Sequence, residues 1–216
     1  MEDRGVVLDK DKMSQGLEAL DKALGEDEMI YAFSPITMVS AGGYLAVSYF
    51  QNRSTTEDID VIIDPEHASD KELLCKMRTA MVTVGRDLGF GKKWINDSVA
   101  LFVSKSARNS IFEDAEKQNI VLWSGENLRI LAAPLEWGLE TKLRRLSTKP
   151  HHLKSVTDTD DVLVILNSLI DRNKGLLERD AVRRLNRNGF DVAISYHVLD
   201  QIAEAYQQRY GNSPFC

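Results

Sequence analysis

Apolar and polar positions recur with two different periods along the chain, and the change of period predicts where helices and strands lie. Leu17, Leu20 and Leu24 recur at helical spacing before a glycine, which predicts a helix over about 13–25. An apolar run at 36–39 predicts a short buried strand, and a short helix is expected over 44–50. Over 58–63 apolar and acidic residues alternate, so this strand should present Asp58 and Asp60 on one face.

The remaining pattern predicts an α/β half followed by a helical half. A long helix should run from a Ser69 cap to about Leu88, and strands are expected near 99–103, 120–123 and 128–132. Pro134 should open a helix at its first position, and helices are expected over about 135–147, 158–171, 178–188 and 195–209. The expected fold class is therefore α/β (α+β), with a mixed sheet flanked by helices over 1–134 and a helical region over 135–216 docked on it.

Composition narrows the class of protein without identifying it. The chain has 216 residues and a net charge of −6, which gives no general attraction to nucleic acid. Two distant cysteines make no disulfide framework, the start lacks the apolar core of a signal peptide, and no apolar run approaches the ~18 residues of a membrane span. We expect a cytoplasmic protein with no membrane partner. The sequence does not indicate an oligomeric state.

The segment 40–63 brings together residue types that suit phosphate and metal chemistry. Gly42 and Gly43 permit a sharp turn and let a phosphate approach backbone N–H groups, and Arg53 adds a planar cation. Asp58 and Asp60 on one face repel each other unless a cation lies between them, which suits Mg²⁺ or Mn²⁺ with a nucleoside triphosphate. Taken alone, such acids are more often a solvated outer face of a strand.

The order of these residues resembles the nucleotidyltransferase superfamily, in particular its small branch of bacterial antitoxin, toxin and abortive-infection proteins. The resemblance lies in the segment Gly42-Gly43…Arg53-Ser54-Thr55-Thr56-Glu57-Asp58-Ile59-Asp60. It implies that the two aspartates hold the metal and that the glycine turn, Arg53 and Thr56 bind the nucleotide. Members often have a similar Trp-apolar-Asn stretch before a later strand, which here ends at Asn96 and implies a residue lining the pocket. The alternative, which we favour for this stretch taken alone, is that Trp94 anchors a loop on the core.

The same resemblance extends to the helical half. Members of this branch often carry a lysine on the helix after the last strand and then a helix that begins D-x-x-D, which here are Lys142 and Asp158–Asp161. The resemblance implies that Lys142 neutralises phosphate charge and that Asp161 orients it or acts as a base. The alternatives are a solvent-facing lysine and a set of acids that favour the start of a helix.

One departure from the family pattern concerns a third metal-binding carboxylate. Many members place it on a later strand, but the strands expected near 99–103, 120–123 and 128–132 contain no acid. Asp97 and Glu126 only flank them. Either one of these loop acids serves, or Asp161 serves, or a mechanism with two metal ions is not used.

Basic residues gather in a stretch of the helical half that has no acid between Thr141 and Thr157. Lys142, Arg144, Arg145, Lys149 and Lys154, with His151 and His152, are predicted as a positive stripe that contacts a tRNA. Arg183, Arg184 and Arg187 form a second cluster. A solvated helix face and loop is the alternative for each.

Three functions follow from these features. The first is metal-dependent transfer of a nucleotidyl group from a nucleoside triphosphate to a small-molecule, protein or tRNA acceptor. The second resembles, loosely, fungal synthases of arginine-containing cyclodipeptides, which use aminoacyl-tRNAs without a metal; the paired carboxylates would then bind a guanidinium. The third is a non-catalytic, antitoxin-like binding protein.

Overall fold

A computed structural model describes residues 6–149, 152–190 and 192–216, and the chain divides into two compact units. We call Met1–Ala133 the α/β unit and Pro134–Cys216 the helical unit. Each is described by itself, so the predicted docking of the helical region stays a prediction. His151, predicted as part of the basic stripe, lies outside the described residues.

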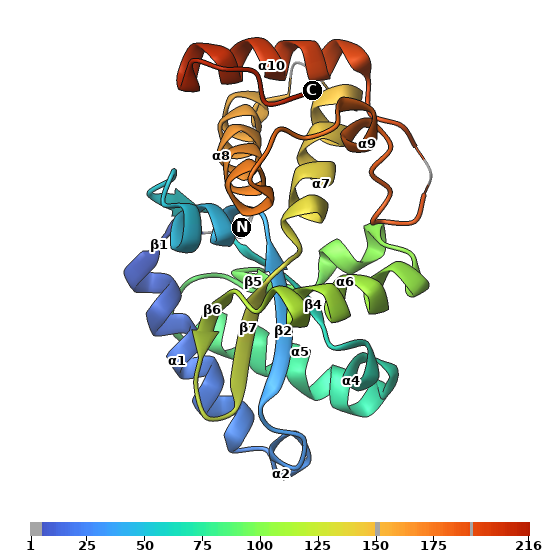
Figure 1. Cartoon of the computed structure of the whole chain (residues 1–216). Coiled ribbons are helices and arrows are strands. Elements are labelled where there is room, and N and C mark those ends of the chain that lie inside the picture. The colour runs from blue at the N-terminus through green and yellow to red at the C-terminus, as the bar shows by residue number, and fades with distance from the viewer. Residues whose placement is uncertain (1–5, 150–151, 191) are drawn as a thin grey trace. The chain divides into compact units, whose positions relative to one another are not determined.

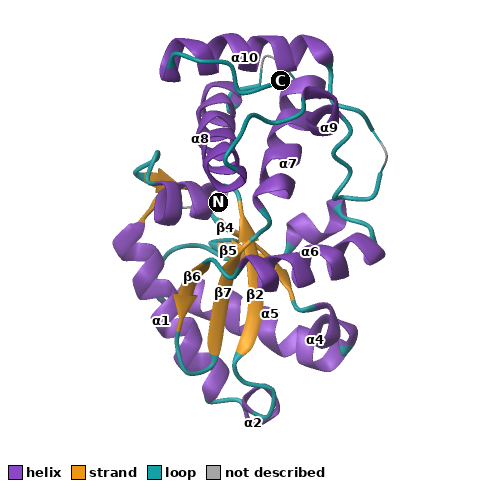
Figure 2. Ribbon diagram, in the orientation of Figure 1, coloured by secondary structure: helices purple, strands orange, loops and turns teal. Residues whose placement is uncertain are grey.

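The α/β unit is built on a five-stranded mixed sheet in the order β5-β4-β2-β7-β6 (Figure 2). The central strand β2 pairs antiparallel with β4 on one side and parallel with β7 on the other, β5 runs parallel to β4, and β6 runs antiparallel to β7. A separate two-stranded sheet joins β1 to β3. The strands are β1 (Leu8–Asp9), β2 (Ile36–Ala41), β3 (Thr55–Thr56), β4 (Ile59–Ile63), β5 (Ile95–Asn96), β6 (Val121–Ser124) and β7 (Leu128–Ala132).

The helices of the α/β unit follow or separate these strands, as Figure 1 shows. They are α1 (Lys10–Gly25), α2 (Glu28–Tyr31), α3 (Gly43–Leu45), the π-helical turn η1 (Ala46–Phe50), α4 (Pro65–Ser69), α5 (Lys71–Asp87), the 3₁₀ turn η2 (Ser98–Phe102) and α6 (Lys105–Gln118). The predicted class, a mixed sheet with flanking helices, is thereby confirmed.

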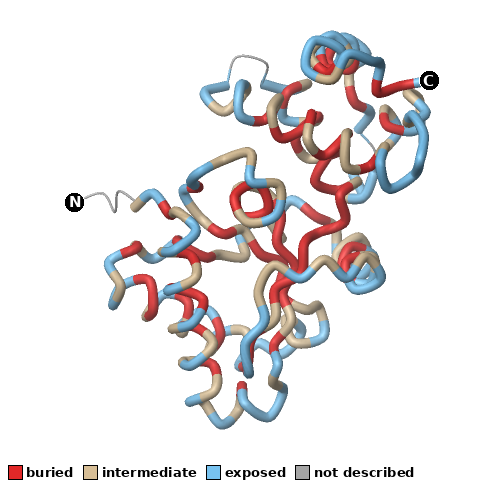
Figure 3. The backbone as a smooth tube through the Cα atoms, turned by 60° about the vertical axis from the view of Figure 1, so that its left-hand side comes forward, coloured by how far each residue is buried: buried red, intermediate tan, exposed pale blue. Residues whose placement is uncertain are grey.

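The core of the α/β unit lies between the sheet and the pair of helices α1 and α5. Ile59, Val61 and Ile63 of β4 belong to it and are buried, as the alternation in the sequence predicts. Figure 3 shows the buried backbone gathered inside the unit. The apolar stripes of the two helices meet this face, and Trp94 joins them, its indole N–H donating to the Met81 carbonyl oxygen at 2.8 Å. One face of β4 thus packs on the core, and its other face carries Asp60 and the buried Ile62.

The helix starts follow from aspartate caps. Asp9 accepts from the N–H of Lys12 at 2.9 Å, and Asp70 accepts from that of Leu73 at 3.1 Å, which caps α5. The predicted Ser69 cap is therefore wrong by one residue, because Ser69 ends the preceding short helix α4 and donates instead to the Glu66 carbonyl oxygen.

Two further expectations for the α/β unit are wrong. The apolar run 99–103 forms the 3₁₀ turn η2 rather than a strand, and it leaves Leu101 and Phe102 exposed. Residues 105–118, for which no element was predicted, form α6. Only Ile111, Phe112 and Ala115 of that helix are buried, which is too sparse an apolar pattern to indicate a helix.

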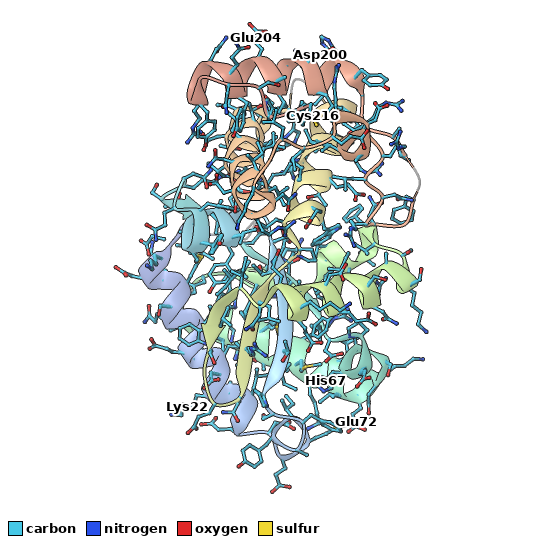
Figure 4. All side chains as sticks on the ribbon, viewed as in Figure 1. Lys22, His67, Glu72, Asp200, Glu204 and Cys216 are labelled. Atoms are coloured by element: carbon cyan, nitrogen blue, oxygen red, sulfur yellow. The ribbon has the colours of Figure 1, made fainter. Side chains whose placement is uncertain are left out.

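The helical unit consists of α7 (Leu135–Thr148), α8 (Ser155–Asn173), α9 (Arg179–Arg183) and α10 (Tyr196–Tyr210). Pro134 lies just before α7 rather than at its first position, and the helix predicted over 178–188 shortens to α9. Helix α10 buries Leu199, Ile202 and Tyr206, while Asp200 and Glu204 point outward from the unit (Figure 4). Among the described helices of both units, none has the length and apolar character needed to cross a bilayer.

Candidate functional site

The glycine pair lies where the central strand ends and a helix begins. Gly42 follows β2 with φ 74° and ψ −137°, a conformation that residues with a side chain rarely adopt, and its carbonyl oxygen accepts from the N–H of Ala46 at 3.2 Å. The helical stretch is short, because the three residues of α3 pass directly into the π-turn η1. The turn predicted from the sequence is therefore present and needs glycine at its first position.

Gly43 is needed for a different reason, which is contact with Thr56. A Cβ on residue 43 would lie 1.9 Å from the hydroxyl oxygen of Thr56, far inside any normal contact. The same hydroxyl donates to the carbonyl oxygen of Asp58 at 3.1 Å. Thr56 therefore joins the glycine turn to the segment that leads into the acidic strand.

Asp60 lies beside the glycine turn. It pairs with Ala41, the residue before Gly42, and its Oδ2 is 3.7 Å from the place that a Cβ on Gly42 would occupy. The buried hydroxyl of Ser40 donates to the carbonyl oxygen of Asp60 at 2.7 Å, which fixes the backbone at this position. The carboxylate of Asp60 is half-buried.

Asp58 reaches the same face through Asn96. Asn96 is the register partner of Asp60 in the parallel pair β4–β5, and paired residues present their side chains to the same face of a sheet. Its amide nitrogen donates to Asp58 Oδ2 at 3.3 Å, while its amide oxygen accepts from the N–H of Ser98 at 3.1 Å. Both acids therefore lie on the face away from the core, with Asn96 orienting one of them.

The structure thus brings together most of the residues predicted for the α/β unit. Six of them form one connected group: Gly42, Gly43, Thr56, Asp58, Asp60 and Asn96. Arg53 is half-buried in the loop between η1 and β3. Sequence reasoning missed Ser40, because a serine inside a buried strand gives no signal that its hydroxyl holds the neighbouring strand.

The donor set fits one hard cation together with its ligand. Mg²⁺ binds through one or two protein carboxylates and completes its octahedron with water and phosphate oxygens, so Asp58 and Asp60 suffice. Asn96 is turned with its N–H groups toward Asp58 and is a positioning residue rather than a metal ligand. The described residues include no group of three histidines, cysteines or acids arranged to hold a metal by themselves.

Neither flanking acid provides the missing third carboxylate. Asp97 accepts three hydrogen bonds from Arg78, at 2.6 to 3.2 Å. Glu126 is exposed in the β6–β7 turn, just before Leu128. Leu128 pairs with Ile36, the first residue of β2, whereas the glycine turn follows Ala41, the last residue of β2. Glu126 is therefore at the opposite end of β2 from the glycine turn. Of the acids considered from the sequence, those that the described α/β unit places at this site are therefore Asp58 and Asp60.

Lys142 and Asp161, the two residues predicted for the helical unit, lie in a buried charged cluster between α7 and α8. Lys142 is 5 % exposed; its ammonium donates to Asp161 and lies 3.5 Å from Asp158. Arg145 adds two hydrogen bonds to the Asp158 carboxylate, each 2.5 Å long. The solvent-facing lysine considered as an alternative is thereby excluded.

The charges in this cluster decide the protonation of Asp158. Burial alone would raise the pKa of Asp158, but the hydrogen bonds from Arg145 and the positive charge of Lys142 outweigh it and hold the pKa below its usual value. The sequence offered a signal for this cluster. Lys142 and Arg145 are three residues apart on one helix, as are Asp158 and Asp161 on the next, so each pair shares a face.

The predicted basic stripe is largely neutralised inside the helical unit. Besides Lys142 and Arg145, Arg144 donates to the fully buried Glu140 at 3.0 Å and to the Leu185 carbonyl oxygen at 2.7 Å. Of the five predicted cations, Lys149 is exposed and Lys154 is half-buried. In the second cluster, Arg183 lies over the ring of Tyr196 at 4.3 Å. The basis for tRNA contact is therefore narrower than the sequence indicates.

The acidic face beside the glycine turn is the site with the clearest chemistry. It offers two carboxylates, a glycine turn and an orienting amide. Comparison of the chain with models of known protein families, with curated proteins and with solved structures gave no match.

Proposed function

We propose that the chain is a nucleotidyltransferase-fold enzyme that transfers a nucleotidyl group from a nucleoside triphosphate to an acceptor hydroxyl or amine. The observation that carries the proposal is the placement of Asp60 against Gly42, with Asp58 held on the same face by Asn96. Two carboxylates beside a glycine turn suit a triphosphate and its cation, because the turn presents main-chain N–H groups to phosphate oxygens.

We assign each residue a role in this proposal. Asp58 and Asp60 would hold Mg²⁺ or Mn²⁺, and a bound ion neutralises charge on the phosphates as pyrophosphate leaves the α-phosphorus. Gly42 would let the phosphates approach the backbone of the turn, Gly43 and Thr56 hold the turn against the acidic segment, and Arg53 is the proposed phosphate clamp. In the helical unit, Lys142 is proposed to neutralise phosphate charge, and Asp161 is proposed to orient Lys142.

A second candidate is an enzyme that joins aminoacyl groups from tRNAs into a cyclodipeptide. It is favoured by the site having two carboxylates, since a pair of acids also suits a guanidinium or an amine. The neutralised stripe weighs against it, because Arg144 and Arg145 are engaged within the helical unit. We therefore rank it below nucleotidyl transfer.

Calorimetric titration separates these functions. ATP, GTP, CTP and UTP are titrated with and without Mg²⁺ or Mn²⁺ into the wild-type chain, Asp58→Asn and Asp87→Asn. Asp87 is the matched control, because it has the same chemistry on the same unit and its side chain is 61 % exposed. We expect metal-dependent binding of at least one nucleotide, weakened at least tenfold in Asp58→Asn and unchanged in Asp87→Asn.

Two results would overturn the proposal. One is nucleotide binding that Asp58→Asn leaves unchanged. The other is the absence of binding for all four nucleotides with either metal. In the second case, cyclodipeptides in the medium of an expressing host would support the aminoacyl-transfer function, and their absence would support a non-catalytic, antitoxin-like binding protein.

A further inference from the structure

A second hollow lies in the α/β unit, next to Asp97, the residue that follows Asn96. Asn96 faces Asp58, whereas Asp97 lines this hollow with Arg78. Its volume is about 550 Å³, and residues of β4, α4, α5, η2 and α6 line it. That volume is typical of pockets for small molecules.

The floor of this hollow is apolar. Ile62 and Ile63, at the end of β4, line it and are almost fully buried, and Leu74 of α5 adds to the wall. Leu101 stands at the rim with 78 % of its surface exposed, although residues of this type are usually buried. A ligand with an apolar body would cover Leu101 and gain hydrophobic contact with the floor.

The rim is cationic at the start of α6. Lys105 is the first residue of this helix and Arg108 follows one turn later, while the first turn contains no acid. A lysine here is unfavourable, because the N-terminal end of a helix already carries partial positive charge. Arg108 donates its Nε to the Val103 carbonyl oxygen, and within the described chain neither side chain has a carboxylate partner.

A neighbouring hollow limits the charge that a ligand can carry. It measures about 370 Å³ and shares Lys105 with the first, but its other charged residues are the acids Asp64, Glu66, Glu113 and Glu116. Carboxylates beyond Lys105 repel a polyanion. A ligand with a single anionic group near Lys105 and Arg108 avoids this repulsion.

We infer that the hollow between β4, α4, α5, η2 and α6 binds a small organic anion with one carboxylate or phosphate group and an apolar body. Its anionic group meets Lys105 and Arg108, and its body lies on Ile62, Ile63 and Leu74 beneath Leu101. The inference is independent of nucleotide binding, because none of these residues belongs to the acidic site.

The test uses three probes with the same ring: phenylacetate, phenyl phosphate and the neutral phenylacetamide. Each is titrated into the full chain and followed by calorimetry and by ¹H–¹⁵N spectra. We expect one or both anions to bind, and the anion that binds identifies a carboxylate or a phosphate site. Phenylacetamide should bind at least tenfold more weakly. Asp58→Asn should leave the binding unchanged, which separates this site from the proposed nucleotide site.

The variants test the two cations directly. Lys105→Gln/Arg108→Gln should weaken binding of the anion at least tenfold, whereas Lys105→Arg/Arg108→Lys should retain it. Lys117→Gln removes one positive charge at an exposed position in the last turn of the same helix and should have no effect. The inference is overturned if neither anion binds at millimolar concentration, if the Gln/Gln variant binds as the wild type does, or if phenylacetamide binds equally well.

Discussion

Replacing Gly43 by alanine tests the contact that joins the glycine turn to the acidic segment. The new Cβ would lie 1.9 Å from Thr56 Oγ1 and 2.7 Å from Thr56 Cβ, whereas real Cβ contacts essentially never fall below 3.0 Å. Thr56 must therefore move by roughly 1 Å or more. In doing so it strains its own packing and loses the hydrogen bond to the Asp58 carbonyl oxygen.

The expected cost follows from these terms. Overpacking of this kind costs about 1 to 3 kcal/mol, and the lost hydrogen bond adds about 1 kcal/mol. The lower chain entropy of alanine in the unfolded state offsets about 0.4 to 1 kcal/mol. We expect the free energy of unfolding of the α/β unit to fall by about 1 to 3 kcal/mol, because the collision outweighs the entropic gain.

Urea unfolding followed by tryptophan fluorescence measures this change. In a Trp137→Phe background the remaining tryptophans, Trp94 and Trp123, both belong to the α/β unit. Thr56→Gly removes the atoms that collide, so the double variant with Gly43→Ala should be more stable than the sum of the single changes by at least about 1 kcal/mol.

Gly89→Ala is the control for this cycle. Gly89 has a φ of 70°, and a Cβ at this position would meet no atom within 4 Å, so its cost of about 1 kcal/mol comes from the backbone alone. That cost should add to the cost of Thr56→Gly without coupling. A cost below about 0.5 kcal/mol for Gly43→Ala, or additive costs with Thr56→Gly, would refute the reasoning.

Three other predictions are also measured as changes in the free energy of unfolding. Gly42→Ala should cost about 1 to 3 kcal/mol through its φ of 74°, and Thr56→Gly should not relieve that cost; relief would contradict a backbone origin. Burial raises the pKa of Tyr44 to about 12, so the stability that its neutral phenol contributes below pH 10 is lost as pH rises toward 12. Between pH 10 and 11 the free energy of unfolding of the wild type should fall by about 1 kcal/mol more than that of Tyr44→Phe. Equal losses in the two proteins would contradict the raised pKa. Because the pKa of Asp158 is lowered, its carboxylate stabilises the folded state above its unfolded pKa of about 3.9, and this stability is lost as pH falls through the folded pKa. Between pH 5 and 3, unfolding followed by Trp137 fluorescence should show a smaller loss of stability for Asp158→Asn than for the wild type. Identical losses in the two proteins would refute this.

The sequence predicts well those elements whose apolar pattern is regular. The stripe of α1 and the alternation of β4 locate these elements, and the strict period of two on β4 also places Asp60 on the face away from the core. The run 99–103 shows the limit of this reasoning. Five apolar residues are compatible with a strand or a tight helical turn, and only the tertiary structure selects η2, which leaves Leu101 and Phe102 exposed.

In the candidate site, too, some residues could be predicted from the sequence and others could not. The glycine pair, the two aspartates and Asn96 could be predicted because short-range spacing and family resemblance carry them. The partners of charged residues could not, because they come from distant parts of the chain: Arg145 reaches Asp158 on the next helix, and Arg144 reaches the Leu185 carbonyl oxygen. A run of cations in a sequence therefore overstates the free positive charge when buried acids lie on neighbouring helices.

From the arrangement of Asp58 and Asp60 beside Gly42 we also expect that the proposed metal needs its nucleotide. Two carboxylates leave most of the Mg²⁺ octahedron to water and phosphate oxygens, so tight binding of the free ion is not expected. Metal affinity should therefore rise when the triphosphate is present, because each ligand supplies part of the other's site.

The most direct measurement is a crystal structure of the chain with Mn²⁺ and a non-hydrolysable ATP analogue, with anomalous data collected for manganese. We predict an anomalous peak within about 2.0 to 2.4 Å of carboxylate oxygens of both Asp58 and Asp60, with the phosphates against the Gly42-Gly43 turn. A nucleotide bound elsewhere, or a manganese peak that neither aspartate contacts, would contradict the proposed site.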